Sequence, residues 1–197
     1  MKSYRLRNLV FLALCCDLGL FSKRLIAPAA NVITDFLRIP GGIGTSFSLM
    51  FLIVAAELVP YFGCATLMGA VQSILALSLG MVGSMGAFSP IAYIVPGFVI
   101  DCVFCIFRKM KTAAVTRCAT ANMLSAAAAS LTANFLVFHL WGPVLALYCC
   151  VGLLSGAFCG LLGAVLAKRL KPALSAQEEG NRANRAAYEG KEERAKV

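Results

Sequence analysis

The sequence predicts an all-α integral membrane protein, a bundle of six transmembrane helices with both termini in the cytoplasm. Hydrophobic residues make up 60% of the 197-residue chain and charged residues only 14%, and the mean hydropathy is +0.82. The apolar residues form long runs in which Asp17, Glu57 and Asp101 are the only acidic residues. Because a helix of a soluble protein keeps a polar face, this pattern indicates that the bilayer is the solvent.

Six apolar runs are close to the length of a membrane span. About 20 apolar residues cross a hydrocarbon layer of about 30 Å, and a helix satisfies its backbone hydrogen bonds within itself. The first run follows basic residues, as in a signal peptide, but no small-residue cleavage site follows it, so we retain it as a span. The expected spans are Asn8–Phe21, Ile43–Val59, Cys64–Val82, Phe88–Phe107, Cys118–Phe138 and Pro143–Ala167.

Short segments containing glycine and proline separate most of these spans. Leu58–Gly63 connects spans two and three, and Gly83–Ser89 connects spans three and four, just before a proline suited to a helix start. His139–Pro143 connects spans five and six. Pro96-Gly97 in the middle of span four predicts a bend, because proline removes a backbone hydrogen bond.

The basic residues orient the bundle. The tail after Lys171 carries five basic and five acidic residues, so the whole net charge of +9 lies in residues 1–171. Basic residues accumulate on the cytoplasmic side of membrane proteins, and an internal N-terminus puts ten of the thirteen there: Lys2, Arg5, Arg7, Arg108, Lys109, Lys111, Arg117, Lys168, Arg169 and Lys171. The three others, Lys23, Arg24 and Arg38, fall in the first external loop, and this clustering is an anomaly that points to function.

Two regions follow from this reading. We expect residues 1–171 to form one transmembrane domain and residues 172–197 to form a charged cytoplasmic tail. The tail mixes charges with glycine and alanine and lacks an apolar period. We therefore expect it to be flexible, with at most a short helical continuation of span six.

The nine cysteines predict packing rather than metal binding. Most lie within spans, where cysteine is a small apolar residue. Cys102-x-x-Cys105 has the spacing of a zinc site, but no second pair accompanies it and His139 is the only histidine. A structural zinc site needs four ligands, so we expect no metal and no cofactor.

Small residues recur at every fourth position on two spans. Span six carries Gly152, Gly156, Gly160 and Ala164, and span three carries Ala65, Gly69 and Ser73. Such rows let helix backbones approach closely in lipid. Two interpretations follow: packing within the bundle, or a docking surface for a helix of a partner.

Polar residues inside spans are costly, so they are candidates for function. Glu57, Asp101 and Asn122 fall in the inner half, and we expect nearby arginines to pair with the acids. The first external loop, Lys23–Gly42, mixes polar and large apolar residues and ends in Pro40-Gly41-Gly42. It suits either a lid over a cavity, hinged at the glycines, or an interfacial segment that seals the bundle.

Two stretches of the chain carry a resemblance to a known family: Lys23…Pro28…Asn31…Asp35…Ile39-Pro40-Gly41-Gly42, and then Gly69-x-x-Gln72. They resemble one branch of the substrate-specific S components of energy-coupling-factor (ECF) transporters, a type of ABC importer. The resemblance covers residues 8–170 and includes six spans, internal termini and a long first external loop. It implies a protein of the cell membrane that captures a vitamin or related micronutrient from outside. Delivery then depends on a T component and two ATPase subunits.

The resemblance also implies where the ligand and the partners bind. The ligand is expected in the outer half of the bundle, under the external loops. The candidate binding residues there are Asn31, Asp35, Arg38, Gly41, Gly42, Gln72, Ser89, Tyr93, Asn134, His139 and Trp141. The family docks its T component through small residues on spans one and three, here Ala13, Ala65, Gly69 and Ser73. The chain has no glycine-rich phosphate-binding sequence, so ATP hydrolysis is expected in the partner subunits, and no nucleic acid is expected.

Two other classes of function stay open. A membrane enzyme needs grouped carboxylates or a nucleophile with its base, and the intramembrane acids lie on separate spans. A stand-alone secondary carrier predicts inverted repeats, and spans one to three show no clear similarity to spans four to six. Copurification distinguishes an S component from a carrier, because an S component brings down partner subunits whereas a carrier transports alone in liposomes.

Overall fold

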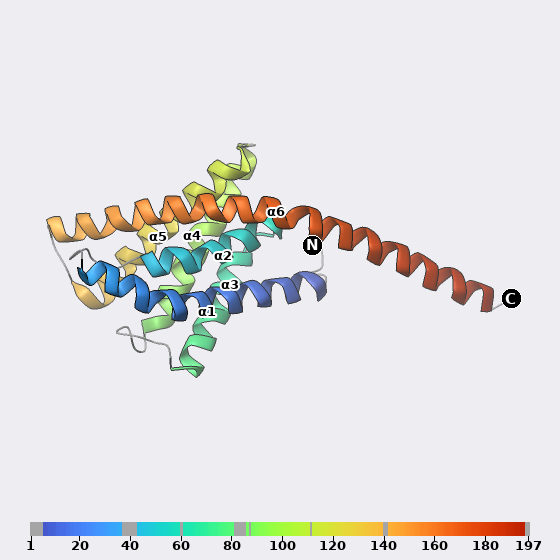
Figure 1. Cartoon of the computed structure of the whole chain (residues 1–197), viewed down its shortest axis with the longest axis horizontal. Helices are drawn as coiled ribbons and strands as arrows, with labels where there is room; N and C mark the ends of the chain where they lie inside the picture. The colour runs from blue at the N-terminus through green and yellow to red at the C-terminus, as the bar shows by residue number, and fades with distance from the viewer. Residues whose placement is uncertain are drawn as a thin grey trace.

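The computed structural model describes residues 6–36, 43–59, 61–80, 86, 88–110, 112–139 and 142–195, and over these residues the chain is all-helical (Figure 1). A five-residue π-helix, η2 (Asn134–Phe138), continues the fifth α-helix. The α-helices are α1 (Leu6–Phe36), α2 (Ile43–Leu58), α3 (Cys64–Ser78), α4 (Ser89–Lys109), α5 (Ala114–Ala133) and α6 (Pro143–Ala195). The predicted all-α class is confirmed, and each expected span overlaps one of these α-helices.

The first and last helices are longer than we expected. α1 has 31 residues and continues through Pro28, so the part of the predicted external loop from Lys23 to Phe36 is helix. α6 has 53 residues, about 80 Å at 1.5 Å per residue, and its C-terminal part projects away from the other helices (Figure 1). The expected short continuation of span six is thus a long one, consistent with the many alanine, glutamate and arginine residues that favour helix.

α2 is the central helix of the bundle, and it contacts each of the other five α-helices. Its residues Leu52, Ile53, Val54 and Ala55 are at most 1% exposed. The core continues into buried residues of α1, α3, α4 and α5, among them Cys16, Ala65, Ile100 and Ala121. The other five α-helices therefore surround α2, and their positions around it determine which helix faces contact one another.

The small residues of α6 pack against α5 within this chain. A Cβ atom on Gly156 would lie 2.9 Å from the carbonyl oxygen of Asn122, and one on Gly160 would lie 2.7 Å from the Cα atom of Ala119. These distances are too short for a side-chain carbon, so only glycine fits at the two positions. Asn122 reinforces the contact, because its amide donates to the Gly156 carbonyl at 2.9 Å.

The small residues of α3 face α4 in the same way. A Cβ atom on Gly69 would lie 2.5 Å from the carbonyl oxygen of Tyr93, and one on Gly97 would lie 2.5 Å from that of Ala65. Ala65 and Ser73 are 0% and 3% exposed. This corrects the expectation that Ala65, Gly69 and Ser73 form a docking surface, because α4 already occupies their face. Of the predicted docking residues, Ala13 alone is exposed.

The inner polar residues have partners within the chain. Arg117 makes a two-pronged ion pair with Glu57, in which Nε donates to Oε2 at 2.9 Å and Nη2 approaches Oε1 at 2.5 Å, as expected. Asp101 differs from the expectation of ion pairing. Its carboxylate instead accepts the backbone N–H groups of Ala65 and Thr66, at 3.2 Å and 2.8 Å.

Two helices of the described chain are long and apolar enough to cross a membrane, α4 and the Pro143–Ala173 part of α6. α2 and α3 are also apolar but shorter, with 16 and 15 residues. Large hydrophobic side chains cover the outside of the bundle, including Phe135, Leu154 and Ile74. Exposed apolar surface on this scale marks contact with a membrane or with another protein. The six-span arrangement stays a prediction.

Candidate functional site

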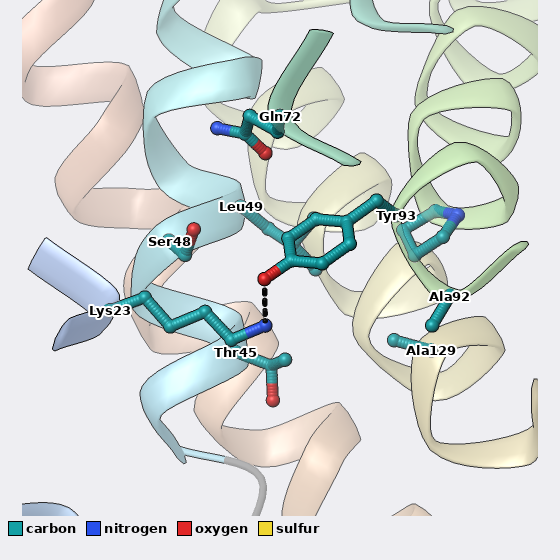
Figure 2. Close-up of a pocket in the computed structure, with 9 residues that line it drawn as sticks. Lys23, Thr45, Ser48, Leu49, Gln72, Ala92, Tyr93 and Ala129 are labelled. Carbon is teal, nitrogen blue, oxygen red and sulfur yellow. Dashed lines mark hydrogen bonds between the residues drawn. The ribbon is translucent and has the colours of Figure 1, made fainter. Parts of the chain in front are cut away.

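A pocket lies where α1, α2, α3, α4 and α5 converge (Figure 2). The cavity itself is about 20 Å³, room for about one water molecule, and the space between its walls reaches about 300 Å³ only when the open mouth is included. A ligand larger than water therefore needs the walls to move apart. The lining residues are Lys23, Thr45, Ser48, Leu49, Gln72, Ala92, Tyr93, Pro96 and Ala129. This mixture of apolar walls with a few polar groups is typical of a ligand-binding pocket.

Lys23 enters the pocket because α1 continues as a helix beyond the predicted first span. Cys16, Gly19 and Leu20 lie on the buried face of α1, and Lys23 follows at the spacing that keeps it on that face. Its ammonium donates a hydrogen bond of 3.0 Å to the Tyr93 hydroxyl and lies 4.3 Å from the centroid of the same ring. The two side chains therefore meet across the pocket (Figure 2).

Gln72 forms the polar wall on α3, where it is 2% exposed. Its Nε2 donates to the carbonyl oxygen of Cys16 at 3.1 Å, and Gly19 leaves space for it, since a Cβ atom there would lie 2.6 Å from Nε2. The Gln72 amide oxygen lies on the side of Tyr93 (Figure 2). Gln72 thus fixes α1 against α3 and presents an acceptor to the pocket.

α2 and α4 supply the remaining walls. The Ser48 hydroxyl donates to the carbonyl oxygen of Gly19 at 2.9 Å, which joins α2 to α1 beside the pocket. Pro96 has no N–H group to donate to the carbonyl of Ala92 four residues earlier, and both residues line the pocket. The predicted irregularity in span four therefore borders a cavity.

The lining is cationic, because Lys23 is charged and the other eight lining residues carry no charge. The acidic side chains lie elsewhere among the described residues. Asp17 is exposed, Glu57 pairs with Arg117, and Asp101 holds the N-terminus of α3. Among the side chains that the structure describes, none compensates the positive charge of Lys23 in the pocket.

Two of the predicted binding residues, Gln72 and Tyr93, meet in this pocket. Ser89 is buried at the start of α4 and Asn134 is buried in η2, whereas His139 is exposed. None of these three lines the pocket. The remaining predictions fall outside the described part: Arg38, Gly41, Gly42 and Trp141 entirely, and Asn31 and Asp35 with respect to their side chains.

The residue list predicted from sequence missed Lys23, Thr45, Ser48 and the apolar wall. Lys23 stood out only as an unusual external charge. Continuing the helical period from Cys16 through Gly19 to Lys23 would have placed it on the inward face. Ser48 and Thr45 carry no comparable signal, because serine and threonine are ordinary packing residues of membrane helices.

The described residues contain no group of three or more His, Cys, Asp or Glu side chains that could hold a metal ion. The nine cysteines are free. Comparison of the chain with protein-family models, with curated proteins and with solved structures finds no match. The case for function therefore depends on the pocket and on the sequence.

Proposed function

We propose that this protein is the membrane-embedded, substrate-capturing subunit of an ECF-type importer, which binds a small micronutrient from outside and delivers it with a T component and two ATPase subunits. The observation that carries the proposal is the pocket between five helices, with Lys23, Gln72 and Tyr93 as its polar groups. The sequence resemblance supplies the class of transporter and its partners.

The position of the pocket supports capture from outside. Thr45 lies in the first turn of α2 and Tyr93 in the second turn of α4. Both helices begin on the external side in the orientation that the basic residues predict. The cluster of Glu57, Arg108 and Arg117 lies at the opposite ends of their helices. A ligand would thus reach the pocket from outside in a six-span protein of the cell membrane.

The exposed face of α1 supports docking of a partner. Ala13 is exposed beside Val10 and Leu14, which are 54% and 57% exposed. A small residue between larger apolar ones suits close approach of a second membrane helix. Within the proposal, the T component contacts this face of α1.

The test combines copurification with ligand analysis. The tagged protein, purified in mild detergent from its native host, should bring down a T component and ATPase subunits and should retain a small molecule detectable by mass spectrometry. Ala92→Phe, which fills the pocket, should abolish retention, whereas Ile91→Phe should not, because Ile91 is exposed. Transport by the purified chain alone in liposomes would instead identify a secondary carrier.

A further inference from the structure

We propose that the pocket selects ligands that carry one carboxylate, with Lys23 as the counter-ion of that group. The proposal rests on the proposed function, since it names the chemical class of the captured ligand. It starts from the charge imbalance of the pocket, where one ammonium group stands among eight uncharged lining residues.

Lys23 supplies the positive charge among the described lining residues of the pocket. Its interactions among the described residues are those with Tyr93, a hydroxyl acceptor at 3.0 Å and a ring at 4.3 Å. Both stabilise a cation without neutralising it. Lys23 is half-buried, and a charge that is partly removed from water attracts an anion more strongly than a fully exposed one.

Hydrogen-bonding capacity points to a carboxylate. An ammonium has three donors and a tyrosine hydroxyl has one, and Lys23 uses one of its donors on Tyr93. Two ammonium donors and the hydroxyl proton are then available for the two oxygens of one carboxylate. A phosphate ester with nearly two negative charges exceeds the single positive charge of the pocket.

The opposite wall fixes which end of the ligand lies at Lys23. The Gln72 amide oxygen is an acceptor on the side of Tyr93 (Figure 2), and it repels a second anionic group while accepting a ligand N–H or O–H. Leu49, Pro96 and Ala129 add apolar surface to the lining. We therefore expect a ligand with a carboxylate at one end and an uncharged body.

The test uses three probes with the same ring and different charge: benzoate, benzamide and benzamidine. Thermal unfolding of the detergent-purified protein is measured over a titration of each probe, which yields a dissociation constant. Benzoate should raise the unfolding temperature, and the neutral and cationic probes should have little effect. Equal protection by benzamide, or protection by none of the three, overturns the proposal.

Variants assign the selectivity to Lys23. Lys23→Gln should weaken benzoate binding by at least about ten-fold, the range expected for a hydrogen bond to a charged group, and Lys23→Arg should retain part of it. Arg24→Gln is the matched control, because Arg24 is the adjacent, exposed cation of α1. If Lys23→Gln does not fold, Tyr93→Phe keeps the ring and should still weaken benzoate binding. Unchanged binding in these pocket variants contradicts the proposal.

Failure of this proposal is distinguishable from failure of the proposed function. A neutral compound that copurifies with the protein and is lost in Ala92→Phe rejects the carboxylate class but supports substrate capture. Selective benzoate binding without copurifying T component and ATPase subunits supports the carboxylate class but rejects the importer.

Discussion

The Asp101 carboxylate on α4 accepts a hydrogen bond of 2.6 Å from the Thr66 hydroxyl at the N-terminus of α3. The same carboxylate accepts the N–H groups of Ala65 and Thr66. The N-cap residue of α3, Gly63, has no side chain to cap the helix and has a φ angle of 88°. A residue from another helix thus supplies the cap, and its negative charge complements the positive end of the helix dipole.

Removal of this cap should destabilise the bundle. Asp101→Ala leaves buried N–H groups of α3 unsatisfied, so we expect a loss of about 1–3 kcal/mol in the free energy of unfolding. Thr66→Val removes only the hydroxyl contact and should cost less. Denaturant or thermal unfolding in detergent measures both. Equal stability of Asp101→Ala and wild type contradicts a capping role.

The ion pair between Glu57 and Arg117 should contribute measurably to stability. Their side chains are 13% and 14% exposed, so water screens the pair less than it screens a surface pair. We expect a coupling energy of about 1–2 kcal/mol, above the roughly 0.2–1 kcal/mol of exposed pairs. A double-mutant cycle with Glu57→Gln and Arg117→Gln isolates this energy. A coupling energy near zero shows that the pair is incidental.

Gly69 should tolerate no larger residue, because α4 lies against it. Gly69→Ala places a Cβ atom where the Tyr93 carbonyl oxygen is 2.5 Å away, so α3 and α4 must separate. Overpacking of this kind costs about 1–3 kcal/mol, and it should also weaken ligand retention, since Gln72 and Tyr93 lie on those two helices. Val71→Leu, on the exposed face of α3, serves as the control. Wild-type unfolding of Gly69→Ala argues against this close helix contact.

The proposed orientation is testable with reporter cysteines in a cysteine-free background. His139 and Phe62 are both exposed, at opposite ends of the bundle. In intact cells, a membrane-impermeant thiol reagent should label His139→Cys, whereas Phe62→Cys should react only after permeabilisation. Labelling of Phe62→Cys in intact cells reverses the topology and with it the external position of the pocket.

The starts of α2, α3, α4 and α6 were predictable within one residue, because they depend on local properties of the chain. The apolar runs at Ile43–Val59 and Cys64–Val82 start at the same residues as α2 and α3. The continuation of α1 through Pro28 was not predicted, since polar residues after Phe21 read as a loop. That helix carries Lys23, so the error concealed the cation of the pocket.

The sequence by itself determined the all-α class, the residues at which several helices begin, the close approach of another helix to the small residues, and the pairing of Glu57 with a nearby arginine. These features follow from hydropathy, helical spacing and charge, which depend on residues that are close together in the chain. Only the tertiary structure decided that Gly69 faces α4, that Asp101 caps α3 and that Lys23 meets Tyr93. Lys23 and Tyr93 are 70 residues apart, and a helix period specifies which side chains share a face but not which helix that face meets.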